Sequence, residues 1–166
     1  MKEAVTINMA EGPKGIRGWL WVFAIPLVLN PVALALGVFQ GINGFLGIGP
    51  LLNPGHVYYS PWWAPLILGE VLYLAAALVG CCWLLVLFFG QKSKFPASWI
   101  RVNVVVAIFL LFDAVGMWLM WRQFPALWKE NEVAEQFRIA AYWWIGIWIW
   151  GKYLRKSRRV KNTFVE

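Results

Sequence analysis

Four long apolar runs, separated by short polar segments, dominate the pattern of the chain. A helix needs about 20 mainly apolar residues to cross the hydrocarbon of a bilayer, and each run comes close to that length. We expect an all-α membrane protein of one domain with four transmembrane helices in an up-down bundle. The predicted helices span about 18–39, 62–89, 99–121 and 136–153, and a basic tail follows over 154–166.

Basic residues fall mainly on one side of this layout. Twelve lie at the same membrane face: Lys2, Lys14, Arg17, Lys92, Lys94, Arg101, Lys152, Arg155, Lys156, Arg158, Arg159 and Lys161. The other face has three: Arg122, Lys129 and Arg138. Because the face with more Lys and Arg stays in the cytoplasm, we expect both termini there.

Composition agrees with the membrane class, since 61% of the residues are apolar and only 14% are charged. The formal net charge of +7 would favour nucleic-acid binding in a soluble protein. Here the cations flank apolar runs, so we expect anionic lipid headgroups on the cytoplasmic side as partners, and no nucleic acid.

Two acids inside the apolar runs require an explanation, because a charge in the bilayer is costly unless it is paired or hydrated. Glu70 follows Trp62 by eight residues, and Asp113 precedes Trp121 by eight. At the helical rise both lie about 12 Å below the outer boundary. Asn30 reaches a similar depth, and the long side chain of Arg138 can extend toward it.

Small residues accompany these polar groups at helical spacing, which indicates that the groups face other helices. Asn30 shares a stripe with Ala33, Gly37 and Gly41, and Glu70 shares one with Tyr73, Ala77 and Gly80. The sequence therefore predicts a polar cluster in the outer half of the bundle. Its members are Asn30, Glu70, Tyr73, Asp113 and Arg138.

Two interpretations of this cluster stay open. In the structural one, Arg138 pairs with one carboxylate while Asn30 and a tyrosine bond the other, which fixes the helix register. In the functional one, two acids facing one arginine leave a negative surplus that holds a proton, a cation or an amine.

The basic tail has two interpretations as well. Its cations are Lys152, Arg155, Lys156, Arg158, Arg159 and Lys161. Each contributes about 1 kcal/mol near an anionic leaflet, so the run can set topology by contacting lipid. Alternatively, it binds a partner protein.

Catalytic, metal and cofactor sites have little support. His56 is the one histidine, and no Cys, Asp or Glu lies near it in the sequence, so no metal or haem ligand set is expected. Cys81 and Cys82 are adjacent and therefore point about 100° apart on a helix, which suits neither a disulfide nor a metal pair. No Ser-His-acid arrangement is evident.

Two terminal segments carry a family resemblance. The residues 15–20, GIRGWL, and 156–165, KSRRVKNTFV, resemble the bacterial domain-of-unknown-function family 2569. The resemblance implies a small four-helix protein of the bacterial inner membrane and brings no catalytic residues.

Three functions remain candidates. The first is a non-enzymatic membrane protein that binds or transports a small cationic or amphipathic solute, or a lipid, through the outer half of its bundle. The second is an accessory subunit of a larger membrane complex. The third is a lipid-modifying enzyme that uses Glu70 or Asp113 as an acid or base. Transport through such a narrow bundle would require a homodimer.

Overall fold

The computed structural model describes residues 16–127 and 129–165, so Lys2 and Lys14 of the predicted cytoplasmic face lie outside the described part. Within it the chain forms helices and no strand, which confirms the all-α prediction. The elements are α1 (Trp19–Gly47), the short 3₁₀ helix η1 (Gly49–Leu52), α2 (Trp63–Phe89), α3 (Phe95–Gln123), α4 (Glu130–Lys156) and α5 (Arg158–Thr163).

Three of the long helices, α1, α2 and α3, are long and apolar enough to cross a membrane. α4 differs in composition rather than in length, since it has 27 residues. Its first turns are acidic, with Glu130 and Glu132, and its later part is rich in tryptophan. The described chain thus has three candidate spans and a fourth long helix beside them.

α3 begins at Phe95 rather than near 99, and two other helix boundaries differ more from the sequence prediction. α1 continues beyond Phe39 to Gly47, because Ile42 and Phe45 extend its apolar pattern through the glycines. α4 begins at Glu130 rather than near 136, because a capping box starts it: the Lys129 backbone N–H donates to Glu132 Oε2 at 3.2 Å.

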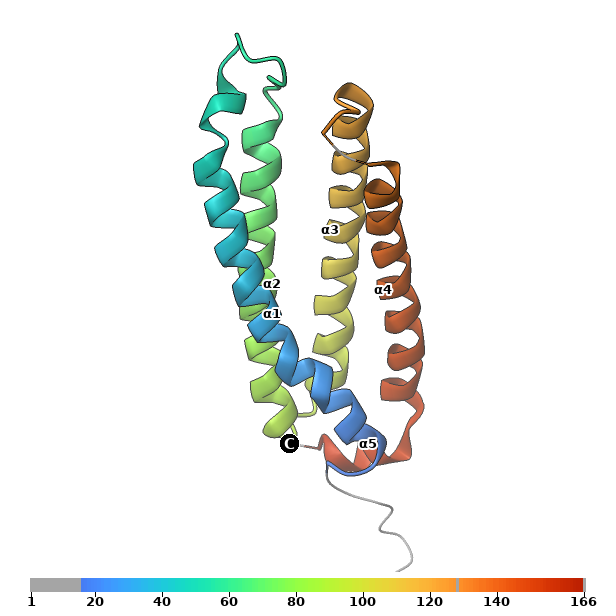
Figure 1. Cartoon of the computed structure of the whole chain (residues 1–166). Helices are drawn as coiled ribbons and strands as arrows, with labels where there is room; N and C mark the ends of the chain where they lie inside the picture. Colours follow the sequence, from blue (N-terminus) through green and yellow to red (C-terminus); the bar gives the residue numbers. More distant parts are fainter. Residues whose placement is uncertain (1–15, 128, 166) are drawn as a thin grey trace, which may run out of the picture.

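The long helices form two hairpins, α1 with α2 and α3 with α4, which diverge toward the top of Figure 1. Glycines set the close packing within the first hairpin, as the small-residue stripe predicted. A Cβ atom on Gly41 would lie 2.8 Å from Val71 Cγ2, and one on Gly37 would lie 3.5 Å from Leu74. The two hairpins contact each other through α2 and α3, and this contact is less extensive than the contacts within each hairpin. Gly116 of α3 lies beside Leu66 of α2 at this contact.

An aromatic cluster holds the hairpins together at their lower end. Phe23 of α1 is its centre: its ring lies 5.3 Å from Trp99 of α3 and 5.1 Å from Trp150 of α4. Phe88 of α2 and Phe95 of α3 are fully buried beside it, with ring centroids 5.1 Å apart. We name this group, with its buried aliphatic neighbours, the aromatic base.

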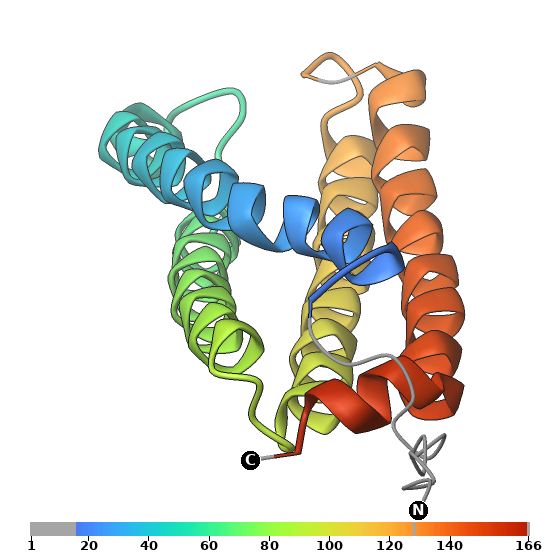
Figure 2. The same cartoon turned by 90° about the horizontal axis from the view of Figure 1, so that it is seen from below.

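α5 crosses the lower end of the bundle, as the view from below shows (Figure 2), and we name this helix the strap. Val160 and Thr163 of the strap are buried. Phe164, which follows it, stacks on Phe95 at 4.8 Å and contacts Phe88 at 5.7 Å. The C-terminal segment therefore closes the lower end of the bundle.

Candidate ligand-binding site

A hollow of about 400 Å³ lies between the two hairpins, above the aromatic base. All four long helices contribute to its wall, which is mainly aliphatic. We name it the acid chamber because its polar wall includes two carboxylates. Its polar lining residues are Asn30, Glu70, Tyr73, Asn103, Asp113 and Gln136.

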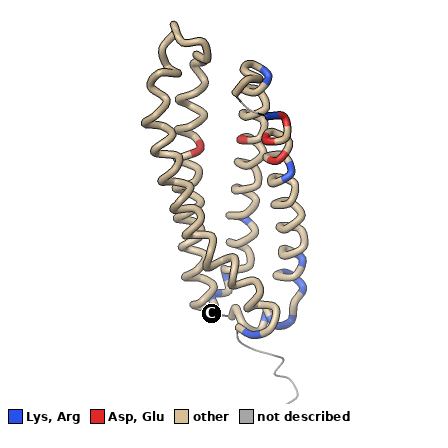
Figure 3. Tube along the Cα trace, in the orientation of Figure 1, with Lys and Arg blue, Asp and Glu red and all other residues tan. Residues whose placement is uncertain are grey.

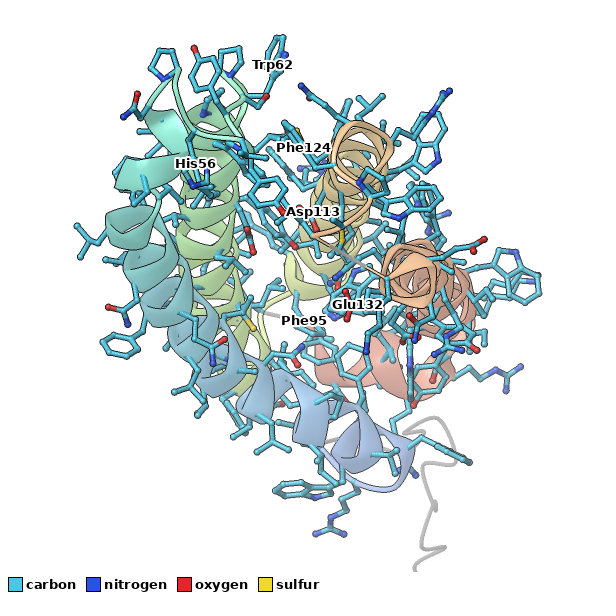
Figure 4. The ribbon with its side chains drawn as sticks, turned by 45° about the horizontal axis from the view of Figure 1, so that its top comes forward. His56, Trp62, Phe95, Asp113, Phe124 and Glu132 are labelled. Atoms are coloured by element: carbon cyan, nitrogen blue, oxygen red, sulfur yellow. The ribbon has the colours of Figure 1, made fainter. Side chains whose placement is uncertain are left out.

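Glu70 of α2 and Asp113 of α3 both line this chamber. Both also line a smaller hollow of about 280 Å³ that extends to Trp63. Figure 4 shows Asp113 in the space between the α2 and α3 ribbons, below Phe124. The shared depth predicted for the two acids therefore brings them together.

No cation balances this pair within the chamber. Of the described residues that line either hollow, none is Lys, Arg or His. Figure 3 shows the same separation along the chain, because most described basic positions gather around the lower end and α5, away from the acids of α2 and α3. The acid chamber thus contains two carboxyl groups and has no basic side chain among its described lining residues.

Arg138 does not join the cluster, which corrects the structural interpretation. Its guanidinium pairs with Glu135 on the same helix, and the two side chains are 59% and 43% exposed. Glu135 is three residues away and therefore within local reach, whereas the chamber is lined by Gln136, Ile139 and Trp143 on another face of α4.

The other two predicted members lie in the chamber. Asn30 lines it from α1, close to Pro26 and Pro31 inside the same helix. Tyr73 lines it from α2, where its ring stacks on Phe109 of α3 at a centroid distance of 5.0 Å.

Two lining residues were missed from the sequence. Asn103 shares a helical stripe with Val106, Leu110 and Asp113, and that spacing could have revealed it. Its amide donates to the Trp99 carbonyl at 2.8 Å. Gln136 was read only as the start of a helix, although it lies one turn before Ile139 of the chamber wall.

Aromatic rings contact each other between the hairpins near Trp63, at the end of the smaller hollow. Phe124, just after α3, lies 6.4 Å from the Trp63 ring and 6.1 Å from the Tyr58 ring. Trp63 Nε1 donates to the Tyr58 carbonyl at 2.9 Å, and the Tyr58 N–H donates to His56 Nδ1 at 3.2 Å. His56 thus orders the loop before α2 and contributes nothing to the acid chamber.

The basic tail lies at the opposite end. Arg155, Lys156, Arg158 and Lys161 are exposed, and Lys152 is exposed beside the Trp148 ring, 3.6 Å from its centroid. Arg159 is partly buried, and its Nη1 donates to the Arg17 carbonyl at 2.7 Å. Five of the six basic side chains of the tail are therefore exposed at the protein surface.

Residues 13–165 match the family described as Protein of unknown function (DUF2569). The chain belongs to this family. No curated protein and no solved structure gave a significant match. The match confirms the resemblance drawn from the two terminal segments of the sequence.

The two DUF2569 segments meet in the fold. Gly18 has a φ of 58°, in the left-handed region that favours glycine, and α1 begins directly after it. A Cβ atom there would lie 2.6 Å from Arg159 Nη1, the atom that bonds the Arg17 carbonyl. The first turn of α1 is therefore tied to the strap.

Substitutions distinguish a structural cluster from an unpaired acid site. Arg138→Gln should change the free energy of unfolding by less than about 1 kcal/mol, because its ion pair with Glu135 is exposed. Glu70→Gln and Asp113→Asn should leave it unchanged or raise it, because each removes an unbalanced charge. SDS-induced unfolding in mixed micelles measures these values. A loss of about 3–5 kcal/mol would instead indicate a broken buried pair.

Proposed function

We propose that this DUF2569 protein binds a small cationic or amphipathic solute in the acid chamber without catalysing a reaction. One observation carries the proposal: Glu70 and Asp113 line a common hollow that contains no basic side chain among its described lining residues. Unpaired carboxylates at membrane depth are costly, and a bound cation offsets that cost. The aliphatic wall around them favours an organic cation over a hydrated metal ion.

Binding fits this conformation better than conduction does. The aromatic base closes the chamber below, where Phe23, Phe88 and Phe95 are buried against one another. The strap and Phe164 cover that contact from underneath. A solute in the chamber consequently has no open path to the lower end.

We also propose that α4 is a fourth transmembrane helix and that both termini lie in the cytoplasm of a bacterium, with the protein in its inner membrane. α4 packs along α3 for much of its length and has no charged residue between Arg138 and Lys152. The exposed cations of the tail then lie beside the inner leaflet, where anionic headgroups attract them.

Accessibility of single cysteines tests this topology in a Cys81→Ala, Cys82→Ala background. Gly55→Cys and Asn131→Cys should react with a membrane-impermeant maleimide on intact spheroplasts, whereas Ser93→Cys and Val165→Cys should react only after lysis. Reaction of Asn131→Cys and Val165→Cys under the same condition would show that α4 does not cross.

Tetraphenylphosphonium is a suitable probe for the chamber, because it is a bulky apolar cation. Its binding to the full chain in nanodiscs can be measured by equilibrium dialysis against empty nanodiscs. The double variant Glu70→Gln, Asp113→Asn should bind about tenfold more weakly or worse, since loss of roughly 1.4 kcal/mol of attraction has that effect.

The matched control is Glu130→Gln, which removes one acid at the start of α4 and outside both hollows. It should bind tetraphenylphosphonium as the unmodified protein does. Equal weakening by Glu130→Gln and by each chamber variant would mean that only the overall charge matters. Unchanged tetraphenylphosphonium binding in the double variant Glu70→Gln, Asp113→Asn would refute the proposed site.

A further inference from the structure

A second hollow, of about 350 Å³, lies between α1 and α4 and extends the acid chamber downward. We name it the side slot. α1 contributes the stretch from Phe23 to Asn30, α4 the stretch from Ile139 to Trp150, and α3 forms the back with Trp99 and Asn103. It ends below at the aromatic base, where Phe23 meets Trp150.

The side slot and the acid chamber adjoin each other. Six residues line both hollows: Leu27, Asn30, Trp99, Asn103, Ile139 and Trp143. An object that fills the chamber can therefore extend into the slot. Along α4 the slot runs for about 16 Å between Ile139 and Trp150 at the rise of a helix.

The chemistry of the two hollows differs sharply. No acid or base occurs among the described residues that line the slot, where the carboxamides of Asn30 and Asn103 are the most polar groups and lie near the chamber end. The lower part is aromatic and aliphatic. The two adjoining hollows thus have acidic side chains at one end and an apolar wall at the other.

The slot also opens sideways. α1 and α4 contact each other at the aromatic base and diverge above it (Figures 1 and 2). Pro26 is exposed at one edge of the slot, and Tyr142, at the other edge, is 64% exposed. In a four-span arrangement this edge faces bilayer hydrocarbon, so a lipid-dissolved molecule can reach the slot without leaving the membrane.

We infer that the ligand is a single-chain cationic amphiphile that enters from the bilayer between α1 and α4, with its head at Glu70 and Asp113 and its hydrocarbon chain in the side slot. This inference rests on the proposed function and adds the ligand class and its route. Charge complementarity selects the head, and the shared wall of the two hollows places the hydrocarbon chain.

The hydrocarbon chain of the ligand determines where the ligand lies and adds little to its binding free energy. Moving a hydrocarbon chain from lipid into an apolar slot yields little hydrophobic free energy, because both surroundings exclude water. The carboxylates attract the cationic head. The slot accommodates the hydrocarbon chain of the ligand while the head is bound. The decisive measurement is therefore the location of the chain.

Photolabelling gives that location. The probe is a tetradecyl ammonium whose far end carries a diazirine, added to the full-length protein in nanodiscs and mapped by peptide mass spectrometry. Labels should concentrate on the α1 and α4 stretches of the slot, around Phe23 to Leu27 and Gly146 to Trp150. A probe with a neutral hydroxyl head should lack this concentration.

Gly146 provides a blocking variant. It lines the slot, and no atom lies within 4 Å of the position that a Cβ would take, so Gly146→Leu should fill the slot without displacing a neighbour. It should remove most slot labelling while tetraphenylphosphonium still binds. Gly44→Leu is the control, because Gly44 has equal space on α1 and lines neither hollow.

The outcomes separate the two proposals. Labels spread over the outward faces of all helices, unchanged by Gly146→Leu, would overturn the side slot as the chain site while acid-dependent tetraphenylphosphonium binding upheld the acid chamber. Slot labelling that is equal for the ammonium and hydroxyl heads would show an apolar lipid site and overturn the cationic amphiphile. Loss of labelling in Gly44→Leu as well would show a folding defect and no block.

Discussion

Two acids that line one hollow, with no basic side chain among its described lining residues and at a depth where charge is expensive, constrain the rest of this structure. A bundle packed tightly along its whole length would force Glu70 and Asp113 into contact with apolar side chains, and neither has a basic partner in the chamber wall. Divergence of the hairpins removes that conflict, because it leaves a hollow around the acids. The hollow and the unpaired charge are therefore two aspects of one arrangement.

Divergence at one end requires firm packing at the other. The aromatic base supplies it through Phe23, which contacts rings from α2, α3 and α4 at once. The strap adds Phe164 below, and the bond from Arg159 to the Arg17 carbonyl ties the strap to the start of α1. The terminal segments 15–20 and 156–165 thus stabilise the closed end, while Glu70 and Asp113 lie in the other half of the bundle.

Much of the fold follows from the sequence, and particular parts do not. Apolar run lengths predict the long helices, and counting residues from Trp62 and Trp121 places Glu70 and Asp113 at one depth. The pairing of Arg138 was wrong because depth alone cannot tell a helix neighbour such as Glu135 from a partner across the bundle. The side slot could not be foreseen, since the glycine stripe predicts that α1 approaches α2 but gives no distance between α1 and α4. The position of Asn103 in the chamber wall could have been predicted, because its spacing to Asp113 places both on one stripe of α3.

Proximity of residues 70 and 113 is the claim on which the chamber, its charge and its ligand all depend. The direct measurement is crosslinking of Glu70→Cys with Asp113→Cys by a short bifunctional thiol reagent in membranes, with Cys81 and Cys82 replaced by alanine and a protease site inserted in the 90–94 turn. The account predicts that the two halves stay covalently joined after cleavage, and that an Arg138→Cys, Glu70→Cys pair separates. Separation of the 70–113 pair with joining of the 70–138 pair would contradict it.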